Sequence, residues 1–169
     1  MPIKHILVPT DFSDGSREAV RYAYDLAIRL DATLHVMHVL ENPFAPGAFM
    51  EMYALPSPDY FLMLEAQAKA RLDASLSDVE KSMVPAVMTT RTGVPATEIL
   101  LRTQEEPGID LIVMATHGRG GVARLVMGSV ADKVLRGAPC PVLTMREHPD
   151  EWKSEEGKWK SVGLAATGS

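Results

Sequence analysis

A short glycine-bearing stretch holds the residue types best suited to binding an anion. Ala115-Thr116-His117-Gly118 is followed by nine residues and then by Gly128-Ser129. Glycines let the backbone approach an anion closely because no Cβ intervenes. The first N–H groups of a following helix lack intrahelical partners and carry partial positive charge. The spacing therefore predicts a loop that holds a nucleotide phosphate.

A second candidate residue follows the first predicted strand. Asp11 lies between the apolar run Ile3–Val8 and a helical pattern, so its carboxylate can accept hydrogen bonds from ribose hydroxyls or an adenine amine. The same carboxylate can instead form a turn or cap ahead of the helix, and the two roles are compatible. Ser129 with Asp132 fits a capping-box-like pattern, which predicts that the Ser129 hydroxyl caps a helix. The backbone N–H groups of Ser129 and Val130 would still be available to a phosphate.

Two side chains in the glycine-bearing stretch could act directly on a phosphate. Arg119 can neutralise phosphate charge, although arginines in loops are more often solvated or paired at the surface. His117 suggests acid–base chemistry, yet no carboxylate or nucleophile at local spacing completes a catalytic set. His35 and His38 fall on opposite faces of one predicted strand, which makes them a poor metal pair. The sequence therefore assigns neither a catalytic residue nor a metal site.

The elements that must position these residues alternate between short β-branched runs and longer amphipathic segments. This pattern is typical of an α/β fold, with a parallel sheet covered by helices on both faces. Strands are expected at Ile3–Val8, Thr33–Val39, Ala86–Thr92, Leu111–Ala115 and Val142–Met145. Helices are expected at Gly15–Leu30, Asp59–Met83, Pro95–Glu105 and Ser129–Arg136. Prolines interrupt the segment from Pro43 to Pro58, which is expected to form a flap.

Composition and charge exclude several classes of protein. The 169 residues are 46% hydrophobic, which suits a single domain with one core. A net charge of −5 disfavours nucleic acid as a partner, because binding to a phosphate backbone needs a basic face. No apolar run approaches the length of a membrane span, and Met1 to Leu7 lacks the features of a signal peptide. We therefore expect a cytoplasmic protein.

The glycine-bearing stretch resembles the nucleotide-binding signature of the universal stress protein family, Gly-x2-Gly-x9-Gly-(Ser/Thr), with Ala115 in place of the first glycine. The opening IKHILVPTDFS, the strand TLHVMHV and the ending APCPVLTMR also look like their family counterparts. The resemblance covers residues 1–146. It implies one open five-stranded parallel sheet of the adenine nucleotide alpha hydrolase-like type, in the order 3-2-1-4-5. Residues 147–169 then form a polar C-terminal tail of unknown role.

The resemblance also implies a ligand, an assembly and a site. The ligand is ATP, or AMP or ADP, with Mg or Mn bound through the phosphates. The assembly is a homodimer formed through the edge strand Val142–Met145. The site lies beyond the carboxyl ends of strands one and four, where the strand order reverses. The candidate nucleotide-binding residues are Pro9, Thr10, Asp11, Val39, Met114, Ala115, His117, Gly118, Arg119, Gly128, Ser129 and Val130.

Three functions are compatible with these residues. The first is an ATP-binding regulatory protein of the stress response that acts by binding, with a protein partner still to be identified. The loop lacks an evident general base and the lysine of a Gly-x4-Gly-Lys-(Ser/Thr) loop. The second is a slow ATPase in which His117 or Asp11 orients water. The third is a nucleotide-free interaction module, suggested by Ala115 and by a tail that carries Trp152 and Trp159.

Overall fold

Five parallel strands form one sheet. The computed structural model describes residues 2–41, 58–105, 107–116 and 127–145. Within them the strand order is β3-β2-β1-β4-β5, which confirms the expected order. The strands are β1 (His5–Pro9), β2 (Thr33–Leu40), β3 (Ala86–Thr92), β4 (Leu111–Ala115) and β5 (Val142–Met145). The expected flap as far as residue 57, the central part of the glycine-bearing loop and the tail at 147–169 lie outside the described residues. The last residue of the expected flap, Pro58, is the first residue of α2.

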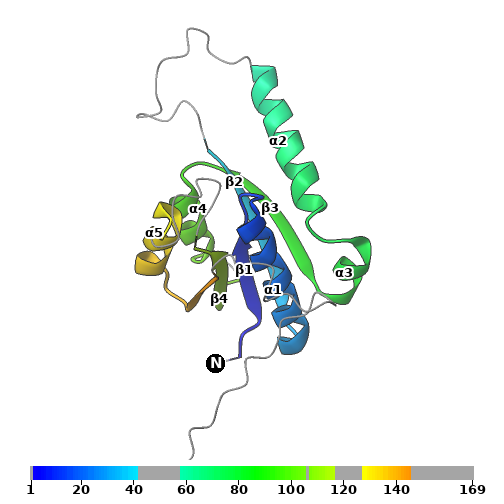
Figure 1. Ribbon diagram of the computed structural model, residues 1–169, viewed down its shortest axis with the longest axis vertical. Helices are drawn as coiled ribbons and strands as arrows, with labels where there is room; N and C mark the ends of the chain where they lie inside the picture. The colour runs from blue at the N-terminus through cyan, green and yellow to red at the C-terminus, as the bar shows by residue number, and fades with distance from the viewer. Residues whose placement is uncertain (1, 42–57, 106, 117–126, 146–169) are drawn as a thin grey trace, which may run out of the picture.

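Helices cover both faces of this sheet, as the alternating pattern predicted (Figure 1). On one side lie α1 (Asp14–Leu30), α2 (Pro58–Asp73) and α3 (Asp78–Met83). On the other side lie α4 (Pro95–Arg102) and α5 (Ser129–Gly137). The sheet is therefore the middle of three layers, and the loops at its carboxyl edge are held by elements from both sides.

Alternation along β1 sends neighbouring side chains into two separate cores. Ile6 packs in one buried cluster with Ala23 of α1. The next residue, Leu7, packs in the other cluster with Ile99 of α4 and Val134 of α5. Burying one such aliphatic side chain contributes about 1.5–3 kcal/mol. Because β1 contributes to both cores, it is fixed at the centre of the sheet.

The segment predicted as one helix over Asp59–Met83 is two helices, so that prediction was wrong. A new cap, Ser77, starts α3 after the end of α2. Ser77 Oγ accepts from the Glu80 N–H at 3.3 Å, and the Glu80 carboxylate accepts from the Ser77 N–H at 2.7 Å. This capping box satisfies the start of a separate helix. The apolar spacing was misleading because Leu72 in the last turn of α2 and Leu76 in the break are both buried.

A buried chain of polar side chains lies near the amino ends of β1 and β2. Arg102 Nη2 is 3.3 Å from His35 Nδ1, and His35 Nε2 is 3.2 Å from His5 Nδ1. Because a guanidinium only donates, His35 accepts at Nδ1 and donates from Nε2. Arg102 also donates to the carbonyl oxygens of Glu105 and Pro107, at 3.4 and 3.0 Å. Burial, followed by the charges of Arg102 and His5, lowers the pKa of His35 to about 4.

The lowered pKa of His35 predicts acid sensitivity. In the unfolded chain this histidine takes up a proton near pH 6.5, whereas in the folded protein it does so only near pH 4. Stability is therefore lost as the pH falls through this window, by about 1–3 kcal/mol from this residue. His35→Gln, whose amide can still accept from Arg102, should remove that part of the slope in urea unfolding measured across pH 7 to 4. Equal slopes in both proteins would contradict the assignment.

Candidate functional site

The carboxyl ends of β1 and β4 lie side by side. The parallel register pairs Ile6 with Leu111 and Leu7 with Ile112. Continuing this register places Pro9 beside Met114. The chain therefore leaves β1 and β4 at the same edge, at the point where the strand order reverses. Open α/β sheets bind their ligands at such a position.

One backbone hydrogen bond brings the start of α5 to the end of β4. The Gly128 N–H donates to the Thr116 carbonyl oxygen at 2.7 Å. The candidates His117, Gly118 and Arg119 lie between these two residues, within 117–126, which is outside the described residues. The hydrogen bond alone is enough to place the N-terminus of α5 at the same sheet edge as β4.

The start of α5 differs from the prediction. Gly128 is the N-cap, Ser129 is the first helical residue, and no side chain of the described residues caps this helix. A capping hydroxyl belongs to the residue before the first helical residue, from which it accepts from the N–H of the second or third helical residue. Ser129 is itself the first helical residue, so the predicted Ser129 cap is wrong. The first intrahelical bond runs from Asp132 N–H to the Gly128 carbonyl oxygen at 3.0 Å. The N–H groups of Ser129, Val130 and Ala131 precede that bond and are the donors an anion would use.

Asp132, the other half of the predicted capping box, pairs with Arg136 instead. Both carboxylate oxygens lie 3.1 Å from Arg136 Nε, one turn along α5. This exposed pair contributes little to stability. It does balance the acidic residue in the first turn of α5. An anion at the helix start therefore meets the partial positive charge of the N-terminus beside a carboxylate that is already paired with Arg136.

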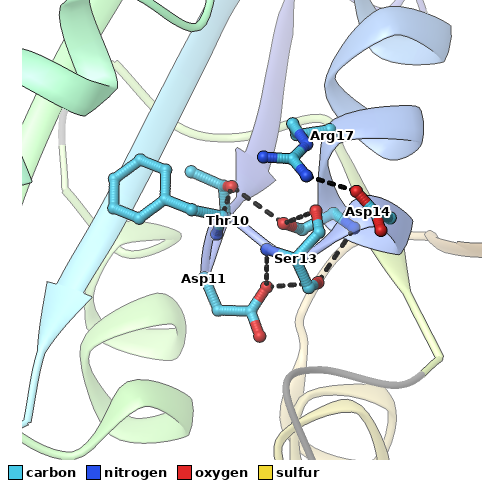
Figure 2. Close-up of polar contacts among 7 residues, drawn as sticks. Thr10, Asp11, Ser13, Asp14 and Arg17 are labelled. Carbon is cyan, nitrogen blue, oxygen red and sulfur yellow. Dashed lines mark hydrogen bonds and ion pairs between the residues drawn. The ribbon is translucent and has the colours of Figure 1, made fainter. Parts of the chain in front are cut away.

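The loop from β1 to α1 is held by its own polar side chains, as Figure 2 shows. Asp11 Oδ1 accepts from the N–H and the hydroxyl of Ser13, at 3.0 and 2.6 Å. Ser13 Oγ accepts from the Ser16 N–H at 3.3 Å and is the N-cap of α1. The turn-forming role of Asp11 is confirmed, whereas the cap is Ser13. Sequence reasoning missed Ser13, although a serine directly before a helical pattern is a typical cap signal.

Thr10 connects this loop to the sheet. Its N–H donates to the Met37 carbonyl oxygen of β2 at 2.8 Å, and its own carbonyl oxygen accepts from His38 Nδ1 at 2.7 Å. Ser16 uses its hydroxyl proton on the Ser13 carbonyl oxygen at 3.0 Å, so the Thr10 hydroxyl donates to Ser16 Oγ, also at 3.0 Å. The buried Thr10 therefore fixes the loop against both β2 and α1.

Ala115 occupies the position where the family signature has its first glycine. Among the described residues, the non-glycine positions with positive φ are Phe12 and Asp31. Ala115 therefore has an ordinary backbone conformation, which alanine adopts without strain. It is half-buried at the end of β4 and pairs with Met145 of β5. The backbone at this position does not require glycine.

The described candidates share one edge of the sheet. Val39 lies near the end of β2, half-buried against the cluster that contains Leu7. No three His, Cys, Asp or Glu side chains in the described parts of the chain come together in a way that could hold a metal ion. Across the same residues, no helix is both long and apolar enough to span a membrane. The candidate nucleotide-binding residues that the structure brings to the edge around β1 and β4 are Pro9, Thr10, Asp11, Met114, Ala115, Gly128, Ser129 and Val130.

Comparisons with known proteins show the family and agree with the observed fold. The model of the Universal stress protein family matches residues 2–146. Universal stress protein MJ0531 of Methanocaldococcus jannaschii is 33% identical over 88% of this chain and 85% of its own length. The solved structure of universal stress protein UspA from Lactobacillus plantarum is 28% identical, with a TM-score of 0.70 over 86% of this chain and 99% of that one. A universal stress protein from Archaeoglobus fulgidus, solved in complex with dAMP, shares the fold at 22% identity, with a TM-score of 0.58 over 85% and 98% of the two chains.

The starts of α1 and α5 predict different effects on stability for two serine substitutions. Ser13→Ala removes the side-chain acceptor that caps α1 and should lower the free energy of unfolding by about 1 kcal/mol. Ser129→Ala removes a hydroxyl with no capping role and should change it by less than about 0.5 kcal/mol. Urea unfolding of both variants beside the unchanged protein measures the difference. A larger loss in Ser129→Ala than in Ser13→Ala would contradict the observed caps.

Proposed function

The chain belongs to the universal stress protein family, and from that membership we propose that it binds an adenine nucleotide, ATP in the first place, and acts in the stress response by binding. The observation that carries this proposal is the uncapped start of α5, tied to β4 by the 2.7 Å bond from Gly128 to Thr116. It lies at the sheet edge where such folds bind ligands. The dAMP complex of a protein with this fold supports the choice of an adenine nucleotide.

In this proposal the two loops divide the nucleotide between them. The N–H groups of Ser129 and Val130 hold a phosphate, together with Gly118 and Arg119. Ser13 holds the Asp11 carboxylate in one orientation. In that orientation the carboxylate accepts hydrogen bonds from the ribose hydroxyls or the adenine amine. Pro9, Thr10, Val39, Met114, Ala115, His117 and Gly128 complete the proposed site. Mg or Mn binds through the phosphates.

Isothermal titration with ATP and magnesium, and with adenosine alone, tests the proposed site. Asp11→Asn keeps the size of the side chain but removes the charged acceptor, and should weaken both ligands roughly tenfold. Asp14→Asn is the matched control, because Asp14 is an exposed carboxylate three positions away that pairs with Arg17. It should leave both affinities unchanged. Absence of binding by the unchanged protein would refute the proposed function and favour a nucleotide-free interaction module.

We propose further that two copies pair through β5. This strand lies at one edge of the sheet. The carbonyl oxygens of Pro141 and Met145 accept from the N–H groups of Ile112 in β4 and of Thr116 directly after it, at 3.0 and 2.7 Å. In a parallel strand, alternate residues turn their polar backbone groups to the same neighbour. Val142 and Thr144 therefore turn theirs away from β4, where a second chain can bind them.

A proline substitution in β5 can test pairing between two copies without disturbing the pairing of β5 with β4. Thr144→Pro removes an N–H that faces away from β4, which an edge strand tolerates. We expect it to convert a dimer to a monomer in light scattering at micromolar concentration. Thr144→Val keeps the N–H and should remain dimeric. A monomeric mass for the unchanged protein, or a dimeric Thr144→Pro with the native circular dichroism spectrum, would contradict pairing through β5.

A further inference from the structure

Phe12 has a backbone conformation that its side chain disfavours. Its φ is 65°, in the left-handed region that bulky residues rarely adopt and that costs about 1–2 kcal/mol. Such a conformation persists only where the surrounding structure holds it. Phe12 lies between Asp11 and Ser13, whose hydrogen bonds orient the Asp11 carboxylate. Whatever holds Phe12 therefore also sets the position of Asp11.

Two side chains from other elements hold the Phe12 ring. The guanidinium carbon of Arg71, in the last turn of α2, lies 4.2 Å from the ring centroid. The His38 ring of β2 lies 4.3 Å from the same centroid, at an interplanar angle of 34°. The Phe12 ring therefore contacts one side chain from α2 and another from β2. We call these three residues the Phe12 stack.

Two members of the Phe12 stack, His38 and Phe12, each form a hydrogen bond with Thr10. His38 donates to the Thr10 carbonyl oxygen at 2.7 Å, and the Phe12 N–H donates to Thr10 Oγ1 at 3.0 Å. Arg71 belongs to a helix that packs on β2 and β3. Figure 1 shows that the N-terminal half of α2 extends beyond the carboxyl edge of the sheet. Through this contact α2 reaches the loop that carries Asp11.

We propose that Arg71 is a positioning residue, which orders the loop from β1 to α1 through its cation–π contact with Phe12 and so couples α2 to nucleoside binding. The second part of this inference rests on the proposed function. Among the described residues Arg71 forms no ion pair, and its guanidinium lies over the Phe12 ring. A cation over an aromatic face at a partly exposed site accounts for roughly a two- to fivefold change in an equilibrium.

The chain offers a matched control on the same helix. Lys69 is exposed, carries the same charge and lies two residues before Arg71, about 200° away around the helix. Arg71→Met and Lys69→Met therefore remove equal charge, but only the first removes the ring contact. Arg71→Lys keeps a cation and should rescue part of the effect. Phe12→Leu removes the ring itself.

Two readouts test the inference separately from the proposed function. By NMR, the side-chain protons of Arg71 should show upfield ring-current shifts that vanish in Phe12→Leu. The amides of Asp11, Phe12 and Ser13 should exchange faster in Arg71→Met than in Lys69→Met. Unchanged exchange in Arg71→Met, or unshifted Arg71 protons, would overturn the inference whether or not the protein binds a nucleotide.

The affinity for adenosine tests the coupling. Arg71→Met should weaken adenosine and ATP equally, roughly two- to fivefold, because a misplaced loop affects the nucleoside. Lys69→Met should leave adenosine unchanged. Loss for ATP alone would show that Arg71 acts by charge on the phosphates, and would overturn the positioning role. No binding of either ligand by the unchanged protein would refute the proposed function and the coupling with it, while the exchange data still decide the loop contact.

Discussion

The hydrogen bonds of Thr10 fasten the end of the central strand to its surroundings, and the candidate site depends on them. The Thr10 N–H and carbonyl oxygen bind Met37 and His38 of β2, and the hydroxyl binds Ser16 of α1. Being buried, these polar groups would cost stability if any of them lost its partner. The chain that follows therefore has little freedom, and Asp11 is presented in one orientation.

The amino and carboxyl edges of the sheet use polar groups for different purposes. Near the amino ends of β1 and β2, Arg102 and His35 satisfy one another and nearby carbonyl oxygens within the protein. At the carboxyl edge, the first N–H groups of α5 have no side-chain cap among the described residues. The first arrangement stabilises the fold, whereas the second leaves donors suited to a ligand. The separation follows from parallel strands, since helices that return to the amino edge direct their N-termini to the carboxyl edge.

Much of the fold could be predicted because its signals are local. The β-branched runs Leu111–Ala115 and Val142–Met145 are strands with the predicted bounds, and turn residues mark their ends. The boundary between α2 and α3 was missed because both Leu72 and Leu76 are buried, so the apolar pattern continues across the break. The cap of α5 was misplaced by one residue, because Gly128 and Ser129 are both acceptable cap residues. The hydrogen bond from the Gly128 N–H to the Thr116 carbonyl oxygen is the tertiary contact at the observed cap.

The sequence by itself determined the fold class and, through its family resemblance, the strand order, and it indicated the sheet edge that we propose as the site. Periodicity, glycine spacing and turn residues act over a few positions and can be followed along the chain. Only the tertiary structure decided that Arg71 and His38 meet at Phe12, and that Arg102 is satisfied by His35. These contacts join residues far apart in the chain, and they depend on how helices pack on the sheet. No local pattern encodes that packing, because it results from the burial of two cores at once.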